Sequence, residues 1–522
     1  MGSYYVTTAI PYVNAEPHLG FALELVQADV LARYHRLASD DTWFLTGTDE
    51  NSLTNVLAAE REGVPVRELV DRNAEAFRAL TGALDISNDD FIRTATDPRH
   101  REGARRFWQA CAEAGDVYRR PYRGLYCVRC ERFYTVEELV ADRCPEHEVA
   151  PDVVEEENYF FQLSRYTGQV SDLLDSGALR VWPASRHREA QAFVARGLAD
   201  FSISRTEARA RGWGISVPGD REQVMYVWFD ALTNYITALG YGTDADRFQR
   251  YWIDNPRRVH VIGKDILRFH AVYWPAMLLS VGLPPPTDIV VHGFLTRDGR
   301  RMSKSLGTGV DPTALALNWG TDAVRYWLLH EVPPSGDADY TDEAFARVYA
   351  ADLANNLGNL VQRTVSMIHR FRAGVVPAPV PTAASRLAVA ARAVPSALHR
   401  GLDEAWDPRL ALDAIFALIS SANRAVAETK PWALARDEHE GDAGARHRLD
   451  SLLWELAESL RVIAEALRPL LPETSDRLAA QLGLTPAPDW RGALQWGGIQ
   501  AGTRVGAPTP LFPRRDRSRS ER

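Results

Sequence analysis

The chain has 522 residues, of which 46% are hydrophobic and 25% charged, and its formal net charge at pH 7 is −9. These values are typical of a soluble globular protein. The chain is too long to form a single hydrophobic core, so we expect three or four modules. Four cysteines exclude a disulfide scaffold, and because we find neither a signal peptide nor an apolar run approaching a membrane span, we expect a cytoplasmic protein with no membrane contact.

The N-terminal segment predicts strand, loop, helix and strand. Residues 4–9 are rich in β-branched and aromatic side chains, as strands are, and a turn with prolines at both ends follows at 11–17. A helix is expected to begin near His18, and residues 42–46 predict a second strand. The helix has one apolar face, formed by Leu23, Val26, Val30, Tyr34 and Leu37. This order is typical of a nucleotide-binding α/β fold, in which ligands bind beyond the carboxyl ends of the strands.

Further strands are predicted at 258–262 and 288–292, each ending in a glycine followed by polar or aromatic residues.

Lysine is rare in this chain: only three of its 60 Lys and Arg residues are lysines. Lys264 follows the first of these strands, Lys304 lies in a glycine-flanked loop after the second, and the third lysine is Lys430. A compact ammonium on a flexible stem can follow a moving phosphate where a planar guanidinium cannot. The first two lysines are therefore candidates for phosphate chemistry.

A cysteine cluster interrupts the α/β pattern between residues 116 and 225. Cys127 and Cys130 are separated by two residues, and Cys144 and His147 repeat that gap after a spacer. Three thiolates and one imidazole at this spacing predict a closed, structural zinc site. The alternative is four unrelated residues in an acidic loop. Cys111 is left over and is expected to be a buried thiol.

The chain from about 350 to 480 is almost entirely helical by its pattern. One apolar stripe is formed by Leu353, Leu357, Leu360, Val361, Thr364 and Ile368. Two later stripes run through 410–426 and 449–470, and a proline-rich connector lies at 376–381. An antiparallel helical bundle is the simplest packing of such segments. The basic residues 514–522 predict a disordered tail.

Two signatures and several shorter motifs resemble a known enzyme family. His18-Leu19-Gly20-Phe21 and Met302-Ser303-Lys304-Ser305 together resemble the two signatures of class I aminoacyl-tRNA synthetases. Five segments narrow the resemblance to methionyl-tRNA synthetases over residues 4–515: AIPYVN from Ala9, TGTDE from Thr46, YVWFDA from Tyr226, GKD from Gly263 and HGF from His292.

The resemblance implies an α/β Rossmann-type catalytic domain with a parallel sheet, an inserted zinc-bearing domain, and an all-α helical-bundle anticodon-binding domain. The expected bounds are 1–115 and 226–325 for the catalytic domain, 116–225 for the insertion with its zinc knuckle, 326–350 for a linker that contacts the tRNA stem, 351–480 for the bundle, and 481–522 for the C-terminal tail. The implied reaction joins methionine to ATP as methionyl-adenylate, releases pyrophosphate, and transfers methionine to tRNA(Met).

The resemblance also assigns roles to individual residues. The catalytic set is His18, Lys264 and Lys304, acting with Mg²⁺ on the triphosphate. The ATP set is His18, Gly20, Phe21, Gly263, Asp265, His292, Gly293, Arg301, Met302, Ser303, Lys304 and Ser305. The methionine set is Ile10, Tyr12, Asp49, Trp228, Tyr235, Ile266, Phe269 and His270. The anticodon set, for the CAU triplet, is Asn359, Arg363 and Trp432. The zinc set predicted from spacing is Cys127, Cys130, Cys144 and His147; members of the family often carry four cysteines here, and His147 is a substitution that zinc chemistry allows.

Three segments depart from the family pattern. Phe21 stands where the first signature usually has a second histidine, Arg301 where the second usually has lysine, and Asn51-Ser52 where His-Gly is usual. Phe21 removes a hydrogen-bond donor to phosphate, a loss of about 3–4 kcal/mol of barrier stabilisation. Phe21 leaves open a weakened paralogue that binds tRNA or adenylate for regulation or drug resistance. A second alternative is a synthetase for another aliphatic amino acid, against which the small insertion and the aromatic pocket argue. We expect a monomer, since no appended domain follows residue 514.

Overall fold

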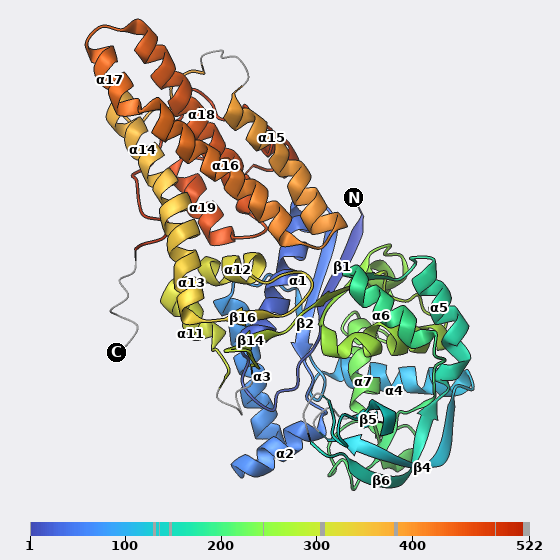
Figure 1. The fold of residues 1–522 in the computed structure, drawn as a ribbon. Coiled ribbons are helices and arrows are strands. Elements are labelled where there is room, and N and C mark those ends of the chain that lie inside the picture. Colours follow the sequence, from blue (N-terminus) through green and yellow to red (C-terminus); the bar gives the residue numbers. More distant parts are fainter. Residues whose placement is uncertain are drawn as a thin grey trace.

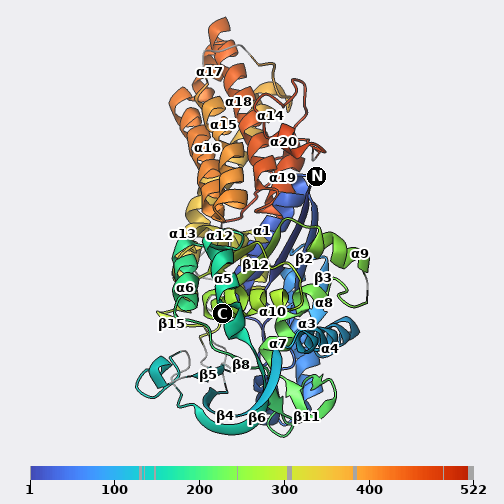
Figure 2. The ribbon, with the colours of Figure 1, turned by 90° about the vertical axis from the view of Figure 1, so that its right-hand side faces the viewer.

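The computed structural model describes residues 2–128, 132–134, 136–145, 149–243, 245–302, 308–379, 385–485 and 487–514. It is elongated, with a helical bundle at one end, a parallel sheet in the middle and an antiparallel arm at the other end (Figure 1). The second view places the bundle and the arm on opposite sides of the sheet again (Figure 2).

The central sheet has six parallel strands in the order β3-β2-β1-β12-β13-β7. Their bounds are β1 Ser3–Thr8, β2 Asp41–Thr48, β3 Asp90–Arg93, β7 Arg180–Trp182, β12 Arg258–Gly263 and β13 Asp288–His292. The strand order reverses between β1 and β12, because β2 lies on one side of this pair and β13 on the other. Such a switch point opens a crevice at the carboxyl ends of the two strands, where ligands bind in α/β folds.

The helices around the sheet follow the predicted α/β alternation. They are α1 Leu19–Leu37, α2 Leu53–Glu62, α3 Val66–Ala83, α4 Pro98–Glu113, α5 Thr167–Asp175, α6 Ala184–Val194, α7 Val227–Leu232, α8 Asn234–Thr237, α9 Ala245–Phe248 and α10 Trp274–Ser280. The apolar face expected for the first helix is buried at Leu23, Val26, Val30 and Tyr34. Cys111 on α4 is fully buried, as expected, and burial raises the pKa of its thiol.

One strand lies where the sequence predicts a separate insertion. β7 falls inside 116–225, yet it pairs in parallel with β13 from Asp288↔Arg180 to Val290↔Trp182. This part of the range therefore belongs to the central sheet, because its backbone completes the β13 edge. The arm consists of two further sheets from this range, one of order β5-β4-β6-β8 and a smaller one of order β10-β11-β9. Their bounds are β4 Val117–Cys127, β5 Arg132–Tyr134, β6 Asp152–Phe161, β8 Phe201–Ser202, β9 Ser204–Thr206, β10 Ser216–Val217 and β11 Asp220–Met225.

A short connecting region leads from the sheet to the bundle. It contains β14 Leu295–Arg297, β15 Arg300–Arg301, β16 Ala338–Tyr340, α11 Pro312–Trp319, α12 Thr321–His330 and α13 Asp342–Val348. Arg325 on α12 is fully buried at the junction: its Nη2 pairs with Asp29 of α1 at 2.7 Å, and its Nε donates to the carbonyl of Leu470 in the bundle at 2.9 Å. One guanidinium thus ties the central sheet region to the bundle.

The bundle consists of α14 Asn359–Arg372, α15 Arg386–His399, α16 Pro408–Thr429, α17 Pro431–His439, α18 Ala443–Leu467, α19 Pro472–Gln481 and α20 Trp490–Ala493. All six residues of the first predicted stripe are buried. We expected no apolar run approaching a membrane span, and this expectation needs correction. By length and composition alone, α16 is apolar enough to cross a membrane. Its apolar face packs against α15 and α18 instead, so it is a bundle helix.

Candidate active site

His18 caps the N-terminus of α1 at the end of the loop that follows β1. Its Nδ1 accepts a hydrogen bond from the backbone N–H of Gly20 at 3.1 Å. Because Nδ1 is the acceptor, the neutral ring carries its proton on Nε2, which makes Nε2 the donor nitrogen. A Cβ at Gly20 would lie 3.0 Å from ring atoms Cε1 and Nδ1, so glycine leaves room for this capping ring. The helix end thus offers N–H groups and a partial positive charge to an anion.

Phe21 is used for packing. Its ring lies edge-on to Phe77 of α3, with centroids 5.0 Å apart, and it joins a small apolar cluster with Val13 and Leu69. The departure from the family signature therefore places an apolar contact between α1 and α3 at this position.

The end of β12 carries Gly263, Lys264 and Asp265 into the same crevice, since β12 lies directly beside β1. Lys264 Nζ lies 2.6 and 2.8 Å from the two carboxylate oxygens of Asp337 and 4.4 Å from the centre of the Phe294 ring. Sequence reasoning missed Asp337, which lies 73 residues away from the lysine.

His292 ends the neighbouring strand β13 and is tied to α1. Its Nε2 lies 3.0 Å from Glu24 Oε2, and its Nδ1 donates to the carbonyl of Gly293 at 2.8 Å. Burial alone would lower the pKa of His292, but the hydrogen bond and charge of Glu24 outweigh it and raise that pKa above its usual value. Gly293 itself must be glycine, because a Cβ there would lie 1.7 Å from the carbonyl oxygen of Gly336.

The second signature is only partly described. Arg301 ends β15, and Met302 is buried, with its N–H 3.4 Å from the carbonyl of Leu295. Ser303, Lys304 and Ser305 lie outside the described residues.

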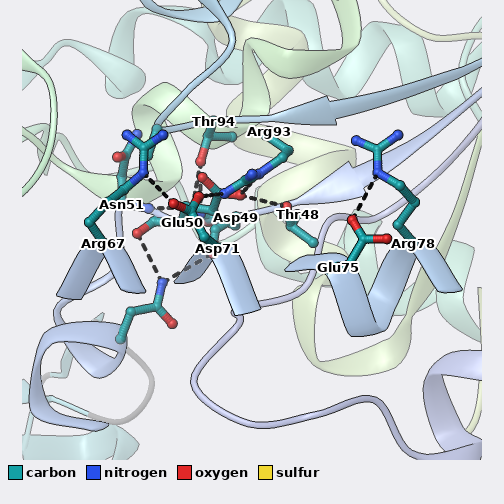
Figure 3. Close-up of polar contacts among 12 residues, drawn as sticks. Thr48, Asp49, Glu50, Asn51, Arg67, Asp71, Glu75, Arg78, Arg93 and Thr94 are labelled. Atoms are coloured by element: carbon teal, nitrogen blue, oxygen red, sulfur yellow. Dashed lines mark hydrogen bonds and ion pairs between the residues drawn. The ribbon is translucent and has the colours of Figure 1, made fainter. Parts of the chain in front are cut away.

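Asp49 follows the end of β2 in a buried polar network (Figure 3). Its Oδ1 accepts from Asn51 N at 3.3 Å and from Thr94 Oγ1 at 3.4 Å. Next to it, Glu50 is fully buried and pairs with Arg93, Nε to Oε1, at 2.5 Å. Burial raises the pKa of Glu50 in spite of that pair. Neither Glu50 nor Arg93 was identified as a site residue from the sequence. The available signal for Glu50 was its position directly after Asp49.

The aromatic residues expected around methionine come together in one cluster. Trp228 stacks on Phe269 with centroids 3.9 Å apart and planes 5° apart. Tyr12 lies 6.5 Å from the Trp228 ring, and its backbone bridges to Asp49. Ile10 and Ile266 pack against the same buried cluster. Aromatic rings attract a thioether by about 0.3–1.5 kcal/mol per contact, so this cage suits a methionine side chain.

A directed hydrogen-bond chain closes the cage. His270 Nδ1 lies 2.9 Å from the carbonyl of Ile266, and its Nε2 lies 2.7 Å from Tyr235 Oη. Burial lowers the pKa of His270 to about 4, so the ring is neutral at pH 7. Nδ1 must then donate to the carbonyl, and Tyr235 must donate its proton to Nε2. The cage wall is therefore uncharged.

The cysteine cluster is described in part. Cys127 and Cys144 are buried together with Tyr134 in a small cluster of their own, and the Cys144 thiol donates to Tyr134 Oη at 3.3 Å. Within the described ranges, no three His, Cys, Asp or Glu side chains are placed to hold a metal ion. Cys130 and His147 lie outside those ranges. Two buried sulfurs in a cluster this small fit half of a zinc site.

The residues expected to read the anticodon lie on the bundle. Asn359 begins α14 and Arg363 is exposed one turn later, while Trp432 lies at the start of α17 with 54% of its surface exposed. Asn423 of α16 donates to the carbonyl of Asn356 at 3.1 Å, which brings the start of α14 beside the helix that leads to Trp432. An exposed tryptophan on this surface is available for stacking.

Comparisons with known proteins identify relatives of this chain. Residues 4–151 and 138–365 match a family model described as tRNA synthetases class I (M). Proteins called methionine–tRNA ligase are 43% identical in Brucella suis biovar 1 over 98% of both chains, and 43% identical in Mycobacterium tuberculosis H37Rv over 98% of both chains. Among solved structures, M. tuberculosis methionyl-tRNA synthetase in complex with methionyl-adenylate has a TM-score of 0.91 at 42% identity, covering 98% of this chain and all of that one.

Proposed function

The chain belongs to the methionyl-tRNA synthetase family of class I tRNA synthetases, and from that premise we propose how its residues carry out the reaction. It is a methionine–tRNA ligase: it activates L-methionine with ATP to methionyl-adenylate and pyrophosphate, and it transfers methionine to tRNA. The observation that carries the assignment of the site is the adjacency of β1 and β12, which brings the His18-capped helix end and Lys264 to one crevice.

Adenylation is an in-line displacement at the α-phosphate. A methionine carboxylate oxygen forms a bond to phosphorus, the bond to the β-phosphate oxygen breaks, and pyrophosphate leaves with that electron pair. We assign His18 Nε2–H, Lys264 and Lys304 to the phosphate oxygens, where fixed donors stabilise charge as it develops. Mg²⁺ bound with ATP supplies further neutralisation of the triphosphate. Asp265 and the backbone of Gly263 are assigned to the ribose.

Methionine binding is assigned to the aromatic cage. The stacked Trp228–Phe269 pair would form one aromatic wall against the thioether, and the neutral Tyr235–His270 pair would close the cage without introducing charge. Asp49 would hold the substrate ammonium, because it is a buried carboxylate linked through its backbone to Tyr12. These assignments favour methionine over a plain aliphatic amino acid.

The remaining roles are proposals of the same kind. We assign a structural zinc ion to Cys127, Cys130, Cys144 and His147, supported by the joint burial of the first and third. We assign the CAU anticodon of tRNA(Met) to Asn359, Arg363 and Trp432, and the tRNA stem to the region 326–350. The other domain bounds, the cytoplasmic location and the monomeric state stay predictions.

Methionine-dependent ATP–pyrophosphate exchange, followed by charging of tRNA(Met), tests the proposal. Purified protein should catalyse both reactions, with methionine preferred over leucine and isoleucine. Tight binding of tRNA or methionyl-adenylate without exchange would instead support the weakened paralogue, since Phe21 contributes packing with Phe77 and no donor to phosphate.

A further inference from the structure

Asp337 lies at the edge of the phosphate crevice, immediately before β16. Its carboxylate contacts two groups: the ammonium of Lys264, at 2.6 and 2.8 Å, and the backbone N–H of Phe294, which donates to Oδ1 at 2.9 Å. The first contact is an ion pair with a proposed catalytic residue. The second fixes the carboxylate to the loop that leaves β13.

The backbone around Asp337 has little freedom. β16 pairs in parallel with β14 from Leu295↔Ala338 to Arg297↔Tyr340. Just before this pairing, the two backbone segments approach so closely that a Cβ on Gly293 would lie 1.7 Å from the Gly336 carbonyl oxygen. Because main-chain contacts hold both sides, the position of the Asp337 carboxylate is set before any ligand arrives.

Lys264 is held on two sides. Its side chain is 24% exposed, with the Asp337 carboxylate on one side and the Phe294 ring 4.4 Å away. An ammonium has three donors, so it can keep a carboxylate partner and still donate to a phosphate oxygen. A flexible lysine stem loses side-chain entropy when it is ordered, and a charged partner that orders it beforehand removes part of that cost from the reaction.

We propose that Asp337 is a positioning residue that holds the Lys264 ammonium in the crevice for the phosphate groups of ATP. This inference rests on the proposed role of Lys264 in adenylation. The carboxylate acts through the lysine and touches no reacting atom itself.

Asp337→Asn is the variant that isolates this role. The asparagine oxygen can still accept from Phe294 N–H, so the backbone clamp is retained while the charge that orients Lys264 is lost. The matched control is Asp339→Asn two residues later. Asp339 clamps β14 in the same way, accepting from Thr296 Oγ1 at 2.6 Å and from Gly299 N at 2.9 Å.

A double-mutant cycle with Lys264→Met, measured by pyrophosphate exchange, tests the proposal. Asp337→Asn should lower kcat about tenfold with the methionine KM changed less than about twofold, since a misplaced group slows chemistry more than substrate binding. Lys264→Met should lower kcat about a hundredfold or more. On that background Asp337→Asn should add less than about twofold, because both changes then remove the same interaction. Asp339→Asn should retain kcat within about twofold, as expected for a clamp that touches no lysine.

Three results would overturn the inference. An equal loss from Asp337→Asn with and without Lys264 would mean that the carboxylate acts elsewhere. A lower KM for ATP without a loss of kcat would mean that Asp337 competes with phosphate for the ammonium. Full exchange activity in Lys264→Met would remove the lysine from the mechanism and the positioning role with it. Thermal unfolding of each variant identifies a loss of fold.

Discussion

Replacing His18 should separate its two tasks, because each uses a different ring nitrogen. Nδ1 caps α1 by accepting from Gly20 N, and Nε2–H is the proposed donor to phosphate. In His18→Asn the amide oxygen can take the place of Nδ1, but the side chain is too short to reach the position of Nε2. We expect stability within about 0.5 kcal/mol of wild type, since asparagine is a favoured cap. The exchange kcat should fall about 10²–10³-fold, the loss typical of one missing donor to developing charge.

His18→Gln provides the opposite case. Its amide nitrogen can approach the Nε2 position, but the longer side chain no longer caps Gly20 N, so stability should fall by about 1 kcal/mol while more exchange activity remains than in the asparagine variant. The measurements are urea unfolding and pyrophosphate exchange at saturating methionine. If His18→Asn keeps wild-type kcat, the imidazole serves only as a cap and the phosphate assignment of Nε2 is wrong.

Three other predictions concern the bundle, the cysteine cluster and the cage. Trp432→Ala should lower tRNA charging tenfold or more and leave exchange intact, since stacking of one base is worth about 1–3 kcal/mol; equal damage to both reactions would indicate a packing role. Native mass spectrometry of chelator-free protein should show one zinc ion, and its absence would refute the site. The pKa of His270 is about 4 in the folded protein, against 6.5 ordinarily, because burial disfavours its charged form. The unfolded chain therefore binds the proton first, and stability is lost as pH falls from 6.5 towards 4. Between pH 7 and pH 5 this group should contribute about 2 kcal/mol of that loss, measured as the difference in urea-unfolding free energy between wild type and His270→Asn. Identical pH dependence in the two proteins would contradict it.

Local patterns predicted the elements of this fold correctly where a single segment carries the information. The strands at β1, β2, β12 and β13, the helix beginning after His18 and the buried stripe of the bundle were all expected, because each depends on residues a few positions apart. The family match came from short motifs in the same way. The family match does not establish the roles of individual residues, which stay predictions.

Contacts between distant segments were beyond such patterns. β7 contributes three residues to the sheet edge, too short a run to distinguish from the arm around it until β13 is seen beside it. Glu50 and Arg93 read as ordinary charged residues, and only the β2–β3 pairing brings the partly exposed Arg93 to the buried Glu50.

By itself the sequence determined the family, the α/β and helical segments, and the helix start near His18, since these follow from neighbours along the chain. Only the tertiary structure decided that β1 and β12 lie side by side, that Phe21 packs on Phe77, and that Asp337 holds Lys264. The physical reason is that parallel strand pairing and ion pairs join residues far apart in sequence. Their partners are selected by how the layers pack and leave no periodic signal in the residues between them.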